Sequence, residues 1–166
     1  MPIKYSNTKG FGMIEVLITL VITTTGILGL AGLQLKALQS NHFAYNRTQA
    51  IVLAYDMADR MRANPEAVDA KNYNQADRTA GSACATSSGC SSAVMAKNDT
   101  YQWHQLLANS LPSGDGLVCI DSTPESTDTP VSPGCDGVGD NYAIKIWWDD
   151  DRDGSIDTPF ITSFQP

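Results

Sequence analysis

A long apolar run near the N-terminus constrains this chain more than any other feature. From Met13 to Leu33 every residue is apolar, Thr or Gly except Glu15. The run has roughly the 20 residues that an α-helix needs to cross a bilayer. It lacks the short apolar core and the small-residue cleavage site of an ordinary secretory signal. The sequence therefore predicts a membrane-spanning helix that the protein retains.

The charges around this run indicate its orientation and its surroundings. Lys4 and Lys9 precede it, and by the positive-inside rule they place the N-terminus in the cytoplasm. After Gly10 the chain carries 9 of its 11 basic residues against 18 acidic residues. Because binding to a phosphate backbone requires clustered Lys and Arg, this acidic balance argues against a nucleic-acid partner.

Glu15 is the one charged residue inside the run. A carboxylate at the edge of a membrane or inside it costs on the order of several kcal/mol unless it is paired or neutralised. Two interpretations follow. The side chain either reaches the headgroup layer and stays hydrated there, or it pairs with a group that the isolated chain does not supply.

Four cysteines lie beyond the run, and neither their spacing nor the two scattered histidines fit a zinc site. An even number of cysteines without metal spacing favours disulfides and therefore an oxidising compartment. If neighbours pair, the bridges are Cys84–Cys90 and Cys119–Cys135. This is one of three possible connectivities.

Helical periodicity continues beyond the membrane segment. An apolar stripe recurs at helical spacing, formed by Ala50, Ala54, Met57 and Met61. Asn64-Pro65 ends the pattern, because the residue before a proline avoids the helical conformation. We therefore expect one helix of about 50 residues at 1.5 Å per residue.

The remainder of the chain predicts a small mixed structure. Residues 71–98 are rich in Ala, Ser, Gly and Thr and predict a loop, and Asp99 is a candidate cap for a helix that Pro112 closes. One face of that helix is apolar, with Trp103, Leu106, Leu107 and Leu111, and we expect Trp103 to anchor the core. Alternating residues predict strands at 116–120, 141–148 and 159–164. The expected fold class is α+β, a long helix packed on a small antiparallel sheet.

No catalytic constellation is present in the sequence. His42 and His104 are isolated, and there is no nucleophile elbow, phosphate-binding loop or zinc-protease motif. We expect a protein that is not an enzyme and that requires no cofactor.

The segment "DDDRDGSID" invites a metal hypothesis. Asp149, Asp151, Asp153 and Gly154 match the D-x-D-x-D-G opening of a calcium loop, in which Ser155 supplies a carbonyl and Asp157 a further oxygen. Phe160 stands where the bidentate glutamate belongs, so any Ca²⁺ affinity is expected in the millimolar range. On this departure the sequence favours, by a small margin, a solvated acidic turn over a calcium site.

The segment "KGFGMIEVL" resembles the class III signal of type IV pilins and type II secretion pseudopilins. The resemblance implies cleavage between Gly10 and Phe11 by a prepilin peptidase and N-methylation of Phe11. It also implies that Glu15 pairs with the N-terminal amine of a neighbouring subunit, so that assembly neutralises the buried charge.

Two further segments, "ADRMRANPEAV" and "WHQLLANSLPSGDG", resemble the minor pilins called type IV pilus modification protein PilV. This resemblance implies a pilin fold and a non-catalytic minor pilin that primes pilus assembly and enters the filament or its tip. Its expected partners are other minor pilins, the major pilin and a tip adhesin. The alternatives are a type II secretion minor pseudopilin and an uncleaved, membrane-anchored periplasmic binding domain.

The pilin resemblance also implies a division of the chain. Residues 1–10 form the leader peptide, 11–63 the transmembrane and assembly helix, and 64–166 the globular head. Before assembly the protein is expected in the inner membrane, as a single-pass protein with a cytoplasmic N-terminus. After assembly it is expected on the cell-surface pilus.

Overall fold

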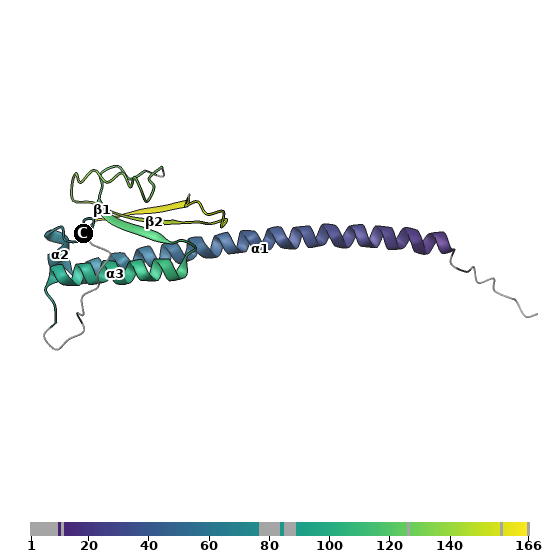
Figure 1. Cartoon of the computed structure of the whole chain (residues 1–166), viewed down its shortest axis with the longest axis horizontal. Coiled ribbons are helices and arrows are strands. Elements are labelled where there is room, and N and C mark those ends of the chain that lie inside the picture. The colour runs from purple at the N-terminus through teal and green to yellow at the C-terminus, as the bar shows by residue number, and fades with distance from the viewer. Residues whose placement is uncertain are drawn as a thin grey trace, which may run out of the picture. The chain divides into compact units, whose positions relative to one another are not determined.

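The computed structural model describes residues 10, 12–76, 84, 89–125, 127–156 and 158–165. In the described chain three helices are followed by three strands (Figure 1). Their bounds are α1 Met13–Ala63, α2 Pro65–Asp69, α3 Ser92–Ser110, β1 Asp115–Ile120, β2 Tyr142–Trp148 and β3 Thr158–Phe164.

Helix α1 passes through two compact units, residues 1–42 and residues 43–166. In the first unit, every described side chain is exposed. An 18-residue window of α1 is apolar enough to cross a membrane, and none of that window is buried. By length and composition this part of α1 is therefore a candidate membrane span, as the sequence predicted.

The second unit is the head, residues 43–166, built on a three-stranded antiparallel sheet in the order β1-β2-β3. Ile146 of β2 lies opposite Gly116 of β1 on one side and opposite Phe160 of β3 on the other. These three strands are the ones that the alternating sequence patterns predicted. The long helix on an antiparallel sheet confirms the predicted α+β fold class.

The core of the head lies between the helices and one face of the sheet. The predicted apolar stripe of α1 faces it, and Ala50, Ala54, Met57 and Met61 are all buried. Trp103 of α3 is fully buried, as expected of a core anchor, and its indole Nε1–H donates to the Leu53 carbonyl at 2.8 Å. Since every residue of the core cluster lies between Ala50 and Phe164, the head contains its own core.

Helix α3 begins earlier than the sequence predicted. It starts at Ser92 rather than at Asp99, and the Ser91 hydroxyl caps it by accepting from the Val94 N–H. Asp99 is buried in the middle of the helix, where its carboxylate accepts from the Tyr73 hydroxyl at 2.7 Å and lies 3.6 Å from Arg60. The prediction was wrong because the apolar residues of the first turns, Ala93 to Ala96, are contiguous and so show no helical period.

The apolar face of α3 is also narrower than predicted. Leu107 and Leu111 are buried with Trp103, but Leu106 is 40% exposed. Its side chain therefore lies at the border of the buried face.

Candidate functional site

The N-terminal part of α1 carries the predicted processing and assembly residues. Gly10 is exposed and lies just before the helix, whereas Phe11 lies outside the described residues. Glu15 stands in the first turn of α1, where its backbone N–H donates to the Gly12 carbonyl at 3.0 Å. A carboxylate in this position is stabilised by the partial positive charge of the helix N-terminus, but only by about 0.3–1 kcal/mol. That is less than the cost of placing the charge in a membrane.

Glu15 has no basic partner among the described residues. The basic groups of the first unit nearest in sequence are Lys4 and Lys9, which lie outside the described part, and Lys36, which lies more than five turns along the helix. The carboxylate is therefore available to a group outside this described part of the chain.

The rest of the apolar segment presents no unsatisfied hydroxyl groups. Threonine hydroxyls donate to backbone carbonyls three or four residues earlier, as from Thr19 to Val16 at 2.9 Å and from Thr23 to Thr19 at 2.7 Å. Thr24 and Thr25 do the same. Since polar groups must find partners inside a bilayer, these bonds make the polar residues of the run compatible with lipid or with neighbouring helices.

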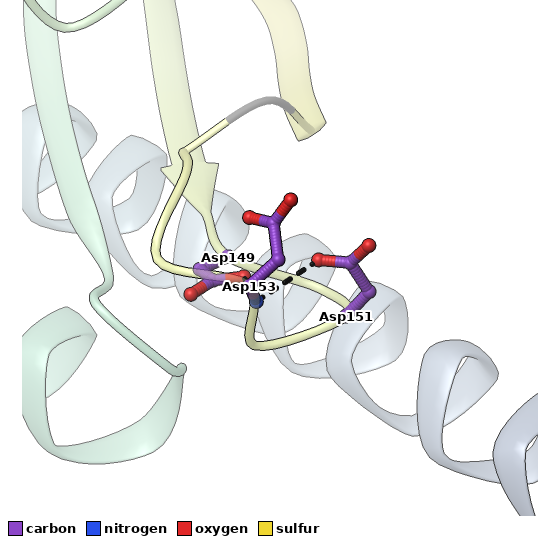
Figure 2. Close-up of side chains that lie close together, drawn as sticks. All are labelled: Asp149, Asp151 and Asp153. Carbon is purple, nitrogen blue, oxygen red and sulfur yellow. Dashed lines mark hydrogen bonds between the residues drawn. The ribbon is translucent and has the colours of Figure 1, made fainter.

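The acidic turn after β2 brings three of the predicted metal ligands together (Figure 2). One carboxylate oxygen from each of Asp149, Asp151 and Asp153 lies within 4.8 Å of the others. Asp149 is buried, and the other two are exposed. Ser155 is exposed nearby, and Asp157 lies outside the described residues.

Backbone hydrogen bonds already organise this turn. Asp149 accepts from the N–H groups of Asp153 and Gly154 at 3.2 and 3.0 Å, and Asp153 accepts from the Ser155 N–H at 2.7 Å. Gly154 has φ +94°, a conformation that side chains rarely adopt. The three carboxylates thus converge in a turn that its own hydrogen bonds hold in shape.

Asp150 fastens the same turn to α1. Its carboxylate accepts from the Asn46 side-chain amide at 3.0 Å and from the Trp148 indole N–H at 2.9 Å. Asn46 is buried in the head, so the turn is attached to the buried face of the helix.

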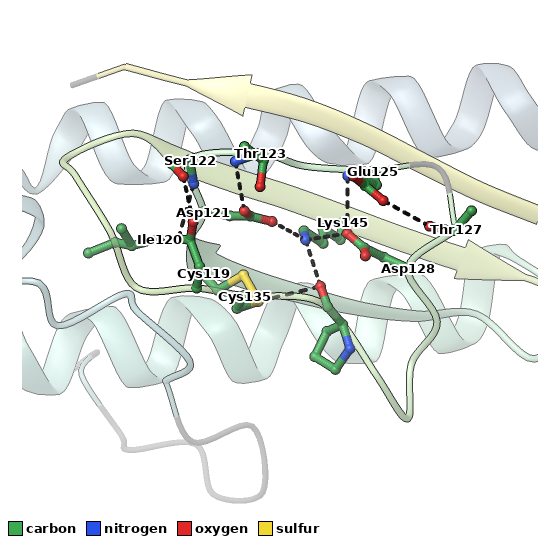
Figure 3. Close-up of polar contacts among 12 residues, drawn as sticks. Cys119, Ile120, Asp121, Ser122, Thr123, Glu125, Thr127, Asp128, Cys135 and Lys145 are labelled. Atoms are coloured by element: carbon green, nitrogen blue, oxygen red, sulfur yellow. Dashed lines mark hydrogen bonds and ion pairs between the residues drawn. A yellow bond between two sulfur atoms is a disulfide. The ribbon is translucent and has the colours of Figure 1, made fainter.

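A second polar site lies on the face of the sheet opposite the helices (Figure 3). The ammonium of Lys145, in the middle of β2, contacts the carboxylates of Asp121 and Asp128 and donates to the Pro133 carbonyl at 2.6 Å. The side chains of Lys145 and Asp121 are fully buried, and that of Asp128 is 11% exposed. Burial opposes the charge, but the hydrogen bonds that the ammonium donates to the two carboxylates outweigh burial and raise the pKa of Lys145 above its usual range.

These acceptors all come from one segment, residues 121–141, which we call the covering loop. The Trp147 indole N–H also donates to the backbone of this loop, at the Asp128 carbonyl and 2.8 Å. The disulfide Cys119–Cys135 closes the loop onto the end of β1. The loop therefore covers the sheet face opposite the helices, and both faces of β2 are buried.

Both disulfides join neighbouring cysteines, Cys84 with Cys90 and Cys119 with Cys135. Of the three connectivities left open by the sequence, this is the local one.

The sequence did not predict the Lys145 site. The partners Asp121 and Asp128 lie 24 and 17 residues from Lys145, in a segment without periodicity. The one available signal was a lysine between Ile144 and Ile146, on the strand face that it shares with the apolar Trp147.

Comparisons with known families match two adjacent parts of the chain. Residues 5–31 match the prokaryotic N-terminal methylation motif. Residues 32–101 match the family described as type IV pilin Tt1218. No curated protein and no solved structure gave a match.

The two matches agree with the structural observations. The methylation motif covers Gly10, Phe11 and Glu15, and the pilin match runs from the end of the membrane segment to the first half of α3. Pilins are structural proteins, in agreement with the prediction that this chain is not an enzyme. The N-terminal motif, the pilin match and the long helix on an antiparallel sheet together support a type IV pilin.

Proposed function

We propose that this pilin is a minor pilin of the PilV kind, which primes pilus assembly and is incorporated sparsely in the filament or at its tip. The observation that carries the proposal is Glu15, a carboxylate without a basic partner in the described chain, at the start of a fully exposed apolar segment. The segments "ADRMRANPEAV" and "WHQLLANSLPSGDG", which resemble PilV-type pilins, support the narrower assignment.

The proposed mechanism begins with processing. A pilin with this motif is processed by a prepilin peptidase and associates with other pilins. Cleavage after Gly10 creates a new amine at Phe11, which is then methylated. In the assembled filament the amine of a neighbouring subunit pairs with Glu15, so the charge is neutralised only when the subunit is in register.

The exposed apolar segment would hold the subunit in the inner membrane before assembly. In the inner membrane, lipid covers the helix, and in the filament the helices of other pilins replace lipid. We propose that the leader is 1–10, the transmembrane and assembly helix 11–63 and the head 64–166. The proposed partners are the prepilin peptidase, other minor pilins, the major pilin and a tip adhesin, with no nucleic acid.

The test of the assembly role is Glu15→Ala, with Glu15→Gln as a second variant and Thr19→Val as the control. We expect the Glu15 variants to be cleaved and to remain in the membrane, yet to be depleted from sheared pili. Thr19→Val should enter pili normally, because its hydroxyl bonds only within its own helix. Recovery of Glu15→Ala in sheared pili at the wild-type level would show that Glu15 merely stays hydrated at the membrane surface.

The alternatives predict different outcomes. A type II secretion minor pseudopilin would share the cleavage but would co-purify with a secretion pseudopilus, and its deletion would impair protein secretion rather than piliation. An uncleaved periplasmic binding domain would retain residues 1–10 and would be unaffected by loss of the prepilin peptidase.

We also propose that the acidic turn binds Ca²⁺ weakly. The convergence of Asp149, Asp151 and Asp153 supports the proposal, and Ser155 and Asp157 are the further candidate ligands. Phe160 replaces the bidentate glutamate, so the proposed Kd is no tighter than about 0.1 mM. At about 1 mM Ca²⁺ such a site would stabilise the folded head by roughly 1.4 kcal/mol.

Melting of the head in calcium, in magnesium and in chelator tests this site. We expect calcium to raise the Tm by a few degrees and magnesium to do less, because magnesium demands a tighter octahedral geometry. The double change Asp151→Asn with Asp153→Asn should abolish the shift. If the melting curves in calcium and in chelator coincide, the turn does not bind calcium and is only a solvated acidic turn.

A further inference from the structure

The two edges of the sheet differ in how they are covered. On the β1 edge, the Gln75 N–H donates to the Val118 carbonyl at 2.8 Å, and the Ile120 N–H donates to the Asn74 side chain at 2.9 Å. On the β3 edge, no backbone hydrogen bond outside the sheet reaches residues 159–164 from any described part of the chain. An unpaired strand edge is a template for another strand.

Pro159 indicates which backbone groups face this open edge. A proline in a sheet is placed where its missing N–H would point away from the ladder. In an antiparallel strand the backbone groups alternate, so Ile161 and Ser163 point their N–H and C=O groups the same way as Pro159. Two residues of β3 therefore present unpaired donors and acceptors outward.

A groove of about 410 Å³ follows the same edge. Successive residues of β3 point to opposite faces of the sheet, so a groove that touches both Phe160 and Ile161 wraps around the edge. One wall comes from α1 and the other from the covering loop. The lining residues are Arg47, Pro124, Pro159, Phe160, Ile161 and Ser163. A strand entering here would lie between the same two layers that cover β2.

The groove carries one positive charge that the described chain leaves unpaired. Arg60 and Arg62 on the same helix form ion pairs with Asp56 and Asp59 at 2.9 and 2.7 Å. Arg47 is exposed at the groove and forms no ion pair with a described carboxylate. A carboxylate on an incoming strand would complement it.

The acidic turn limits this complementarity to a single carboxylate. Asp150 is bonded to Asn46, the neighbour of Arg47, so negative charge already lies at the start of β3. A second carboxylate on the incoming strand would meet this charge and be repelled.

We propose that this groove binds an extended segment of a partner polypeptide, which adds a fourth strand to β3 and places one acidic side chain on Arg47. Backbone pairing with Ile161 and Ser163 provides the attachment, and Arg47 selects the acidic residue. The proposal concerns the head alone and holds whether or not the chain enters a pilus.

The experiment uses the full chain in detergent micelles and a fluorescent peptide of alternating threonine and valine with one central glutamate. The peptide has the 7-residue length of β3. A matched peptide carries lysine in place of glutamate. Two further peptides are N-methylated on one or the other set of alternate amides, because a strand pairs through one of its edges at a time.

We expect the glutamate peptide to bind about threefold to fivefold more tightly than the lysine peptide, the effect of one partly exposed ion pair. Arg47→Gln should remove this preference, and Arg62→Gln, on the same helix but outside the groove, should keep it. One methylated peptide should bind and the other should not. Ile161→Pro should weaken all binding while leaving the Tm near that of the wild type, because its N–H is outside the ladder.

Several results would overturn the proposal. They are the absence of glutamate-peptide binding up to about 1 mM, equal binding of the two methylated peptides, and a preference for glutamate that survives Arg47→Gln. If the full chain self-associates in sedimentation and this association disappears in Ile161→Pro, the occupant is a second copy and the partner proposal is also overturned.

Discussion

Replacing Lys145 by Met removes the charge at the centre of the covering-loop contacts while keeping a side chain of similar length. The change leaves the carboxylates of Asp121 and Asp128 without their cation, and their side chains are 0% and 11% exposed. Breaking a buried ion pair from one side costs about 3–5 kcal/mol, because the remaining charge stays desolvated. Asp128 lies at the rim, so we expect the lower end, about 3 kcal/mol.

The assay is urea and thermal unfolding of the oxidised head, residues 43–166, which contains every residue of the core cluster. For a domain of this size, a loss of about 3 kcal/mol lowers the Tm by roughly 10 °C. Adding Asp121→Asn to Lys145→Met should recover part of the loss, because one of the two uncompensated charges is then gone.

Lys71→Met is the matched control. Lys71 pairs with Asp140 at 3.3 Å, but these side chains are 51% and 89% exposed. An exposed pair contributes about 0–1 kcal/mol, so this variant should melt near the wild type. If Lys145→Met costs no more than Lys71→Met, the buried contacts do not fasten the covering loop and the reasoning fails.

Two further predictions concern the head. Burial and a hydrogen bond to Asp99 raise the pKa of Tyr73, and burial with nearby carboxylates raises the pKa of Tyr142 to about 12. The pKa of Lys145 is also raised. Because the folded pKa values of these three groups lie above their unfolded values of about 10, the groups stabilise the fold below pH 10, and urea midpoints should fall as the pH rises from about 10 to 12. A midpoint that stays constant to pH 12 would contradict this. Gly116→Ala should cost about 1–3 kcal/mol in urea unfolding, because the added Cβ would lie 2.6 Å from the Trp103 ring; an unchanged midpoint would mean that the ring can move aside.

The sequence predicted those elements whose pattern is local. The apolar stripe from Ala50 to Met61 specified the buried face of α1, and the alternation around Ile144 and Ile146 specified β2. The start of α3 was missed because the apolar residues that follow its cap, Ser91, are contiguous and show no helical spacing. Secondary structure without a periodic pattern is specified by tertiary contacts, here the buried bond between Tyr73 and Asp99.

The polar features of the head depend on contacts far apart in sequence. The alternating pattern alone would leave Lys145 in solvent, and only the covering loop, closed by Cys119–Cys135, brings Asp121 to it. The clustering of the three carboxylates in the acidic turn could be predicted from their spacing, because Asp149, Asp151 and Asp153 occupy alternate positions within one turn. The need of Glu15 for a partner or for hydration could also be predicted, because a single charge inside an apolar run is costly in a membrane.

The mass of the mature N-terminus tests the central claim most directly. The Lys9-Gly10-Phe11 junction, with Glu15 four residues further on, matches the methylation motif. In cells with an active prepilin peptidase, mass spectrometry of the membrane-extracted protein should find a chain that begins at N-methylated Phe11. An intact chain that begins at Met1 in those cells would contradict the account of this protein as a processed pilin.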